Sequence, residues 1–162
     1  AALHGKTVLL YFTASWCPPC RRFSPALVAL YEAAKAEGSA FEVVMVPWDH
    51  DEQALRQYAR THDMRWLAVA WEDRELADEL SLRFDVRHVP TVVVLDVDAA
   101  GGARVLSTEG RTEVLEHAAG RGAPAWLRGR EGKGSGGRGT DGGRAAAEFT
   151  PPPASLWRRV FG

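Results

Sequence analysis

Short apolar runs alternate with amphipathic segments along the first 127 residues, and this alternation restricts the possible folds more than any other feature. Four runs have the length and β-branched content of buried strands: KTVLLYF (6–12), FEVVMVP (41–47), WLAVAW (66–71) and TVVVLDV (91–97). Apolar residues at three- and four-residue spacing follow each of the first three runs and predict helices over 18–38, 51–62 and 73–84. A Gly-Gly turn joins the fourth run to a fifth strand, 103–109, and a last helix covers 112–120.

The predicted order β-α-β-α-β-α-β-β-α indicates an α/β fold, with a central mixed sheet flanked by helices on both faces. Strands that alternate with helices pair in parallel through right-handed crossovers, and the final hairpin adds an antiparallel edge. Pro25 lies inside the first helical pattern, where we expect a kink. In the last helix we expect Thr112 to be the N-terminal cap and Gly120 to end the helix.

The composition changes after Trp126, which places the end of the folded domain, 1–127, at this point. In residues 128–144, eight of 17 residues are glycine, five are Lys or Arg, and none is hydrophobic. Such a segment cannot bury enough surface to offset the entropy of ordering it, so we interpret 128–147 as a Gly/Arg-rich linker. Residues 148–162 form a proline- and aromatic-containing tail, whose apolar residues share one helical face: Leu156, Trp157, Val160 and Phe161.

Charge and composition argue against several classes of function. The whole chain has a formal net charge of −1 and 46% apolar residues, which favours a domain with a real core over a nucleic-acid or membrane-surface binder. The charge is uneven, because residues 1–127 carry 13 basic and 18 acidic residues, whereas residues 128–162 carry 7 basic and 3 acidic ones. No apolar run approaches the roughly 20 residues of a membrane helix. The chain begins with Ala rather than Met, so a processed N-terminus stays open.

The only two cysteines, Cys17 and Cys20, stand in the segment TASWCPPCRRF, between the first strand and the first helix. Two cysteines are too few for the disulfide framework of a small secreted domain, and a close pair favours redox chemistry. The N-terminus of a helix stabilises a thiolate, and Cys-X-X-Cys pairs placed there have first-cysteine pKa values of roughly 3.5–7.5, against about 8.5 for a free thiol. We therefore predict that Cys17 attacks a substrate disulfide and that Cys20 resolves the mixed disulfide.

The neighbours of the cysteines have roles in this prediction. Pro18 and Pro19 stiffen the turn and remove two backbone donors. Trp16 shields the thiolate and forms part of a docking surface, with a place in the core as the alternative. Pro90 leads directly into a strand, and from the residues alone we expect an ordinary trans proline there.

Two other kinds of site are disfavoured. Zinc takes four ligands, and none of the five histidines has ligand spacing to the two cysteines. Residues 128–144 are rich in Arg and Gly, as some RNA-binding segments are, but the run is short, mixed in charge and without interleaved aromatics. A plain linker is the better interpretation.

The chain resembles tryparedoxin, within the nucleoredoxin-like members of the thioredoxin superfamily, in the segments YFTASWCPPCRRFSPALVALYE, FEVVMVPWDHDEQ, WLAV, FDVRHVPTVVVLD and APAW. The similarity covers residues 5–127, and the combination of WCPPC with a distant VPT is its most specific part. It implies a thioredoxin fold, thiol–disulfide exchange and a cis peptide bond at Val89–Pro90, beside the sulfur of Cys17. It also implies that the Val89 backbone pairs with a bound substrate chain.

The resemblance extends to further positions. Trp48 and Asp49 match a Trp-Asp pair that follows the second strand in the family. Asp51 falls where tryparedoxins have a glutamate and Arg111 where they have an arginine, and the resemblance implies that these contact the charged ends of a glutathione-type dithiol. The residues alone leave open a helix N-terminal acid for Asp51 and a solvated surface charge for Arg111. Tyr11 occupies the place of the buried aspartate that relays protons in general thioredoxins, so proton transfer needs water or another group.

These observations predict a tryparedoxin-like oxidoreductase that reduces protein disulfides, such as those of peroxiredoxins. The electron donor is a dithiol of the trypanothione or glutathione type, or a reductase, and the chemistry requires no metal or organic cofactor. The alternative is a thioredoxin-like adaptor subunit, held in a larger assembly by a protein partner of residues 148–162. We expect a reducing compartment, hence the cytoplasm, with an organelle open if the N-terminus is processed. Neither a nucleic-acid partner nor a membrane span is expected.

Overall fold

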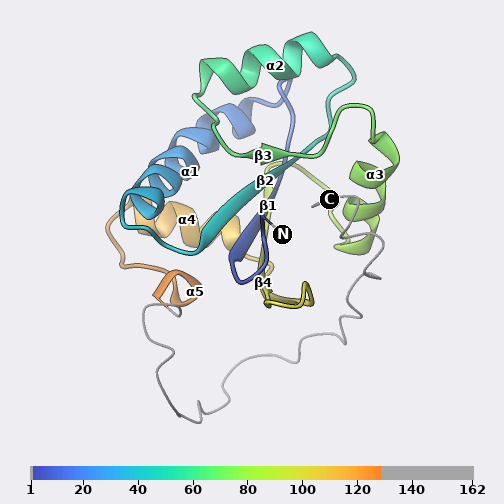
Figure 1. Cartoon of the computed structure of the whole chain (residues 1–162). Coiled ribbons are helices and arrows are strands. Elements are labelled where there is room, and N and C mark those ends of the chain that lie inside the picture. The colour runs from blue at the N-terminus through green and yellow to red at the C-terminus, as the bar shows by residue number, and fades with distance from the viewer. Residues whose placement is uncertain (1, 129–162) are drawn as a thin grey trace.

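A computed structural model describes residues 2–128, which form a five-stranded sheet with helices on both faces (Figure 1). The elements are β1 (Thr7–Thr13), α1 (Pro18–Ala36), β2 (Phe41–Pro47), α2 (Glu52–Thr61), β3 (Leu67–Ala68), α3 (Arg74–Arg83), β4 (Thr91–Val97), β5 (Ala103–Ser107), α4 (Gly110–Ala118) and α5 (Ala125–Arg128). Apart from the short α5, this is the predicted order. Arg128, the first residue of the predicted linker, ends α5, and the rest of the linker and the tail lie outside the described residues, so the domain boundary at 127 stays a prediction. Within the described part, no helix is long and apolar enough to cross a membrane.

The sheet has the strand order β3-β2-β1-β4-β5. β2 is parallel to both β1 and β3, whereas β4 is antiparallel to both β1 and β5. Every residue of β1 and β2 is buried, as expected for central strands that are covered on both faces. Because β1 and β2 are parallel, their carboxyl ends lie side by side, with Thr13 opposite Pro47. The segment with the two cysteines begins at this edge.

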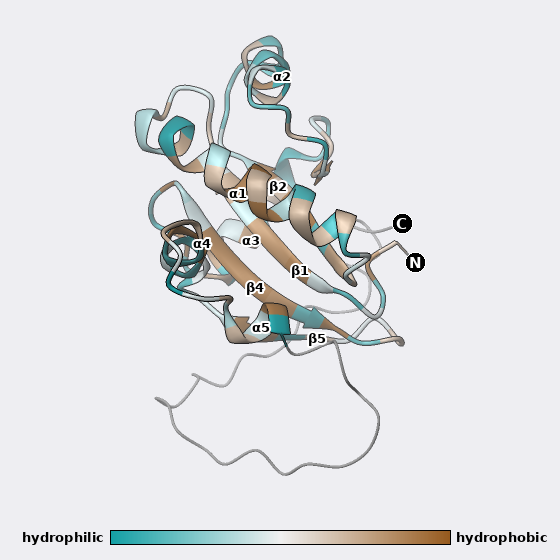
Figure 2. Cartoon of the chain, turned by 90° about the vertical axis from the view of Figure 1, so that its left-hand side faces the viewer, coloured by the Kyte–Doolittle hydropathy of each residue, from teal (hydrophilic) through white to brown (hydrophobic). Residues whose placement is uncertain are grey.

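The two faces of the sheet support two separate hydrophobic clusters, because successive side chains of a strand point to opposite faces. On one face, α1, α2 and α4 pack against Leu9, Tyr11, Val43, Met45, Val92 and Val94. Figure 2 views the molecule from this side, with α1 and α4 in front of the apolar strands. On the other face, α3 packs against Val8, Leu10, Phe12, Val44, Val46, Val93 and Leu95. The predicted arrangement of helices on both faces is therefore confirmed.

The third strand is much shorter than the predicted 66–71. Only Leu67 and Ala68 pair with β2, and both are exposed. The apolar pattern misled because the flanking residues are buried for another reason: Trp66 packs in the cluster under α1 and Val69 in the cluster under α3. The run therefore crosses the edge of the sheet from one face to the other instead of extending along it.

The last predicted helix begins earlier than expected, and Thr112 is not its cap. α4 starts at Gly110, its N-cap is Glu109, and the cap makes no side-chain hydrogen bond. A Cβ on Gly110 would lie 2.8 Å from Val92 Cγ1 and 2.9 Å from Val92 O, so the helix starts where its backbone touches β4. The predicted end is confirmed, since α4 stops at Ala118 and Gly120 has a φ of +78°. Pro25, where we expect a kink, lies inside the single helix α1.

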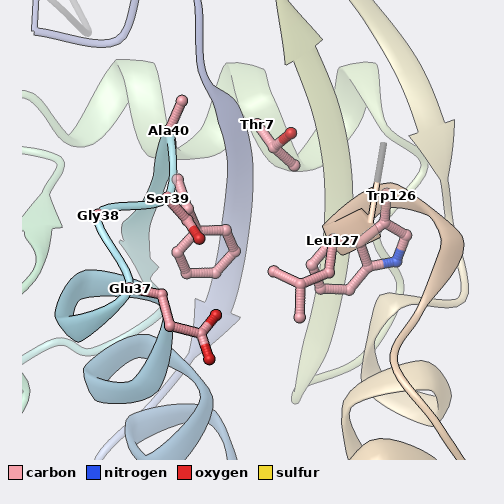
Figure 3. Close-up of a pocket in the computed structure, with 8 residues that line it drawn as sticks. Thr7, Glu37, Gly38, Ser39, Ala40, Trp126 and Leu127 are labelled. Atoms are coloured by element: carbon pink, nitrogen blue, oxygen red, sulfur yellow. The ribbon is translucent and has the colours of Figure 1, made fainter. Parts of the chain in front are cut away.

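The end of the sheet away from the cysteines is closed by α5. Trp126 stacks on Phe41, with ring centroids 6.2 Å apart and planes 8° from parallel, and its Nε1 donates to Glu113. Beside it lies a cavity of about 260 Å³, which the loop 37–40 and Leu127 also line (Figure 3). α5 thus covers the start of β1 and β2, at the opposite end of these strands from the cysteines.

Candidate active site

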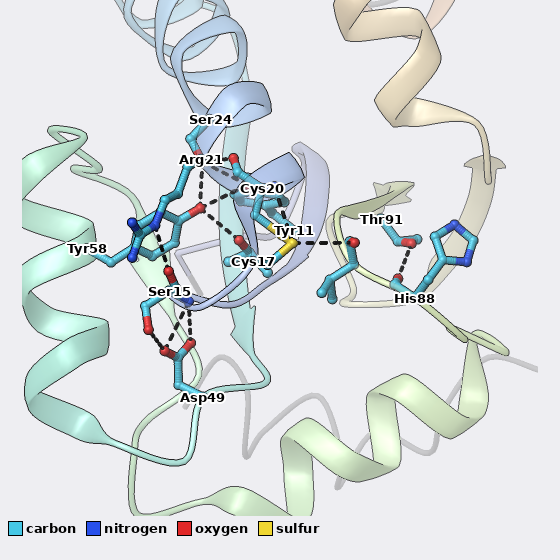
Figure 4. The surroundings of a disulfide bond; sticks show 12 residues. Tyr11, Ser15, Cys17, Cys20, Arg21, Ser24, Asp49, Tyr58, His88 and Thr91 are labelled. Atoms are coloured by element: carbon cyan, nitrogen blue, oxygen red, sulfur yellow. Dashed lines mark hydrogen bonds between the residues drawn. A yellow bond between two sulfur atoms is a disulfide. The ribbon is translucent and has the colours of Figure 1, made fainter.

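The two cysteines form a disulfide at the N-terminus of α1 (Figure 4). Cys17 is the N-cap residue, Cys20 lies in the first turn, and their Cα atoms are 5.3 Å apart. The helix begins here because Pro18 and Pro19 at its first two positions have no N–H that would need a partner. The backbone N–H of Cys20 donates to the sulfur of Cys17 at 3.3 Å. This donor and the helix dipole together favour negative charge on Cys17.

The two cysteines are both buried but differ slightly in their exposure to solvent. Cys17 keeps 4% of its surface exposed, whereas Cys20 is completely buried. Only Cys17 therefore offers an edge to an incoming molecule. Both residues belong to the apolar cluster between α1 and the sheet, with Cys17 at its edge as the N-cap and Cys20 inside the first turn.

Cys17 Sγ lies 3.6 Å from the carbonyl oxygen of Val89, although 72 positions separate these residues in the sequence. The Val89–Pro90 peptide bond is cis, as the resemblance implied and unlike the trans proline expected from the residues alone. Val89 is half-buried and Pro90 is buried at the start of β4. Because β4 pairs antiparallel with β1, with Thr91 opposite Phe12, the ledge before β4 lies beside the cysteines that follow β1.

Trp16 is exposed to 58%, so its place is on the surface next to the disulfide and not in the core. Together with Trp48 and Leu82 it lines a groove of about 490 Å³ between the cysteine loop and α3. Leu82, at 83% exposure, is one of the most exposed apolar residues of the described chain. The sequence analysis did not single out Leu82, because the apolar pattern of α3 marks only the inward face of this helix. Trp48 is held by a 2.9 Å hydrogen bond from its Nε1 to Ser81 Oγ.

Asp49 fixes the loop before Cys17. Its carboxylate is buried and accepts hydrogen bonds from the backbone N–H of Ser15, at 3.0 Å, and from the Ser15 hydroxyl. Its own carbonyl oxygen accepts from Arg74 Nη2 at 2.5 Å. Ser15 O in turn accepts from Arg21 Nε at 2.7 Å. These contacts tie the cysteine loop to the end of β2 and to α1 and α3.

Asp51 and Arg111 lie in different settings. Asp51 is exposed and caps α2, since its Oδ1 accepts from the N–H of Ala54 at 3.1 Å. This is the helix N-terminal acid that the residues alone left open. Arg111 lies in the first turn of α4 and lines a cavity of about 510 Å³ together with His88, Pro90 and Thr91. Arg111 therefore shares a cavity with the cis proline, and Asp51 is not among the residues that line it.

Beneath Cys20 lies a group of buried hydroxyls, here called the hydroxyl cluster: Tyr11, Thr13, Ser24 and Tyr58. Ser24 Oγ lies 2.8 Å from Tyr11 Oη and 2.7 Å from Tyr58 Oη, and Tyr58 Oη lies 2.9 Å from Thr13 Oγ1. Ser24 also donates to the carbonyl oxygen of Cys20 at 2.9 Å. Burial raises the pKa of Tyr11 far above its ordinary value, so this phenol stays neutral.

The resemblance put Tyr11 in the place of a buried aspartate, but the sequence analysis did not predict the cluster or its other members. Ser24 stands one helical turn after Cys20 on the buried side of α1, a spacing that would have placed it under the active site. Tyr58 comes from α2 and carries no such signal. Within residues 2–128, no three His, Cys, Asp or Glu side chains gather as a metal site.

Comparison with known proteins gives a consistent result. A family model described as thioredoxin-like matches residues 5–100. Tryparedoxin from Trypanosoma brucei brucei is 40% identical over 115 residues, which are 71% of this chain and 76% of that protein. Nucleoredoxin from Bos taurus is 36% identical over 124 residues, 76% of this chain but only 27% of the relative. The chain thus spans about a quarter of the nucleoredoxin.

Solved structures agree with this assignment. Tryparedoxin II from C. fasciculata superposes with a TM-score of 0.64 at 40% identity, over 73% of this chain and 77% of the other. A structure of tryparedoxin II complexed with glutathionylspermidine superposes with a TM-score of 0.66 at 38% identity, over 76% of this chain and 82% of the other. At these identities the likeness includes the sequence as well as the fold.

Proposed function

Since this chain belongs to the thioredoxin-like family, with tryparedoxin among its relatives, and is a thiol–disulfide oxidoreductase, we propose that it passes electrons from a small dithiol to the disulfides of other proteins. The observation that carries this proposal is the contrast between the two cysteines at the start of α1. Cys17 keeps 4% of its surface exposed and Cys20 keeps none. Cys17 can therefore meet a substrate, and Cys20 can react only with Cys17.

The proposed reaction has two displacements. The thiolate of Cys17 attacks a sulfur of the substrate disulfide, forms a mixed disulfide and releases the first substrate thiolate. The sulfur of Cys20 then attacks Cys17 Sγ, closes the internal disulfide and releases the second thiolate. The Cys20 N–H, 3.3 Å from Cys17 Sγ, stabilises the thiolate before the first step and after its return to the reduced state. A dithiol restores the reduced protein by the same exchange in reverse.

Protein substrates would bind along the ledge formed by Val89 and Pro90. A substrate strand that pairs with the backbone of Val89 would bring its disulfide to Cys17, because Val89 O is only 3.6 Å from Cys17 Sγ. Trp16, Pro18 and Pro19 would contact the same substrate from the other side. Peroxiredoxin-type disulfides are the substrate class that we infer from the tryparedoxin relatives.

The electron donor would be a glutathione-type dithiol, in keeping with the relative that was solved with glutathionylspermidine. Arg111 offers a guanidinium beside His88 in the cavity of the cis proline, where a carboxylate of the donor would bind in bidentate fashion. Asp51 uses one carboxylate oxygen as a helix cap and would have acceptor capacity left for an amine of the donor.

Replacing Arg111 tests the identity of the donor. Arg111→Ala should raise KM for a glutathione-type dithiol about tenfold, the loss expected for one charge-assisted hydrogen bond. The rate with dithiothreitol, which has no charged ends, should not change. Arg104→Ala is the matched control, because Arg104 is an exposed arginine that pairs with Asp96 on the neighbouring strand. An equal loss with both dithiols, or no loss with either, would contradict the assignment of Arg111.

Replacing the cysteines tests the function itself. Cys20→Ser should retain a protein substrate as a mixed disulfide on Cys17, which mass spectrometry of the trapped complex would identify. Cys17→Ser should trap nothing and should abolish the reduction of a protein disulfide by a dithiol donor. Turnover that survives in Cys17→Ser would exclude the proposed mechanism.

A further inference from the structure

A basic pocket lies beside the cysteine loop and takes no part in the exchange of sulfur atoms described above. It has a volume of about 440 Å³ and lies between the start of α1 and the helix α2. Its polar lining is formed by Ser15, Arg21, Gln57, Tyr58, Thr61 and His62. None of the described residues that line it is acidic, although residues 1–127 contain more acidic than basic residues. The pocket therefore differs in charge from the domain around it.

Arg21 is fixed in this pocket with part of its guanidinium unused. Its Nε donates to the carbonyl oxygen of Ser15 at 2.7 Å. Within residues 2–128, no ion pair joins Arg21 to a carboxylate. Its two Nη groups are thus left for a ligand, and a pair of parallel N–H bonds from one guanidinium is what a carboxylate binds in bidentate fashion.

The electrostatic setting of His62 also indicates that the pocket lacks a negative charge. Burial lowers the pKa of His62, and the positive charge of Arg21 on α1 lowers it further. A carboxylate close to the imidazole would instead raise this pKa. The other polar side chains that line the pocket carry no charge at neutral pH: Ser15, Gln57, Tyr58 and Thr61. The positive charge of Arg21 is therefore uncompensated here, which favours an anionic ligand.

The pocket and the substrate ledge lie on opposite sides of the disulfide. Figure 4 shows Arg21 and Ser15 on one side of the cysteines, and His88 and Thr91, next to the ledge, on the other. Ser15 stands two residues before Cys17, so their Cα atoms are no more than about 7 Å apart. A substrate chain that lies on the ledge and crosses the disulfide can therefore continue to the pocket.

We propose that this pocket binds an acidic side chain of the protein substrate, so that Arg21 selects disulfides with a carboxylate close to the reacting cysteine. The inference rests on the proposed function, because it concerns the substrate of that reaction. The carboxylate accepts from the Nη groups of Arg21 and from an N–H of His62. Both residues determine specificity in this arrangement, and the exchange itself stays with Cys17 and Cys20.

Peptides that differ in one charge test this selection. Each peptide has one cysteine, blocked as a mixed disulfide with a chromogenic aryl thiol, and either Glu or Gln at one of the four positions within two residues of it. Cys17 of the reduced full-length chain attacks the peptide sulfur, and the aryl thiolate that leaves reports the rate of capture. Dithiothreitol has no pocket, so its rates correct each pair for intrinsic reactivity. For at least one position, the wild-type chain should react about fivefold faster with the Glu peptide, as expected for a partly exposed ion pair.

Two neighbouring arginines of α1 provide the variant and its control. Arg21→Gln should abolish the preference, so that Glu and Gln peptides react at equal corrected rates. Arg22→Gln removes the same charge one residue further along, but Arg22 is exposed and does not line the pocket, so the preference should remain. The ratio of the two peptides cancels any change that Arg21→Gln causes in Cys17 or in the loop at Ser15. A merely structural role of Arg21 would therefore leave the ratio unchanged.

A second measurement does not depend on the reaction. In the oxidised protein, the preferred Glu peptide with serine in place of its cysteine should raise the pKa of His62, because a bound carboxylate favours the imidazolium form. NMR of the imidazole protons would follow this titration. The corresponding Gln peptide should cause no such rise. His117, at the end of α4, is the internal control, and its titration should be the same with both peptides.

Each outcome leads to a different conclusion. Equal corrected rates for Glu and Gln peptides at all four positions of the wild-type reaction would overturn the inference and leave the proposed function intact. A preference that Arg21→Gln and Arg22→Gln reduce equally would also overturn it, because general charge attraction would then be responsible. An unchanged pKa of His62 with the preferred Glu peptide would overturn the part assigned to His62. A reduced wild-type chain that released no aryl thiolate from any peptide would contradict the proposed function itself.

Discussion

Asp49 holds the loop before Cys17 in place with a carboxylate that is 1% exposed. The residue pairs with both the N–H and the hydroxyl of Ser15, 34 positions earlier in the chain. The sequence identified Asp49 only through its resemblance to a family pair, since nothing in the local pattern points to a partner so far away. A contact of this kind becomes visible only when β1 and β2 are aligned in the sheet, with their carboxyl ends at the same edge.

Removal of the Asp49 carboxylate should destabilise the protein and release the loop before Cys17 from its contact with Asp49. We expect Asp49→Ala to lower the free energy of unfolding by about 2 kcal/mol, because the buried N–H of Ser15 loses its acceptor. Urea unfolding of the oxidised protein would measure the change. Glu52→Ala is the control: Glu52 is a surface carboxylate paired with Arg56 on the same helix, and its loss should stay within about 0.5 kcal/mol. Equal losses in the two variants would show that Asp49 has no special part in the loop.

The helices and strands follow the apolar pattern where packing and propensity agree. β1, β2 and β4 have clear patterns because both of their faces are covered. β3 is shorter than predicted because the residues of its apolar run pack in two hydrophobic clusters, Trp66 on one face of the sheet and Val69 on the other. α5 has only four residues, too few for a helical period to show in the sequence.

The start of α4 can be tested by mutation, because this helix begins where Gly110 touches Val92 of β4 and not at the predicted cap, Thr112. Alanine is a better helix former than glycine by about 1 kcal/mol, yet Gly110→Ala should destabilise the protein by about 1–3 kcal/mol. The added Cβ would meet both the side chain and the backbone of Val92. Thermal unfolding would measure the effect.

Thr112→Ala is the matched control on the same helix. A true cap would cost about 1 kcal/mol on replacement, but Thr112 is exposed and lies inside the helix, so we expect almost no change. A stabilised Gly110→Ala protein, or a Thr112→Ala protein that loses as much, would contradict this account of the helix start.

In the whole molecule, the redox site and the packing that closes the core lie at opposite ends of the same strands. Cys17 follows the end of β1, whereas Trp126 of α5 stacks on Phe41 at the start of β2. Seven residues of β-strand span about 23 Å. The resemblance named both Cys17 and the distant Val89–Pro90 bond, which the structure brings together at the first end. It included the segment with Trp126 but gave no contacts for the second end, where Glu37, Trp126 and Leu127 come together from distant segments.

The stability of the folded protein should fall at high pH, in part because of one buried tyrosine, Tyr31. Burial, together with the negative charge of Glu42, raises the pKa of Tyr31 to about 12. Between pH 10 and 12, Tyr31 ionises in the unfolded chain but keeps its proton in the folded one, so unfolding releases a proton and stability decreases as the pH rises. Below pH 10 the two states bind this proton equally, and no such decrease is expected.

Tyr31→Phe removes this contribution and leaves the others in place. Lys35, whose ammonium lies 5.1 Å from the Tyr31 ring, and Glu42 are present in both proteins. Urea unfolding between pH 10 and 12 should show a larger loss of stability in the wild-type protein than in the variant. Parallel curves for the two proteins would exclude a raised pKa at Tyr31.

The unequal exposure of the two cysteines also determines which of them peroxides can oxidise. Peroxides convert an accessible thiolate to sulfenic acid, and further oxidation to the sulfinic state is irreversible in most proteins. Cys20 has no surface open to solvent and is shielded from such oxidants. Oxidation by peroxides is therefore confined to Cys17. There the adjacent thiol condenses with the sulfenic acid and forms the same internal disulfide that ends a normal turnover. An early oxidative lesion at this site is thereby returned to the catalytic cycle, and a single dithiol suffices to repair it.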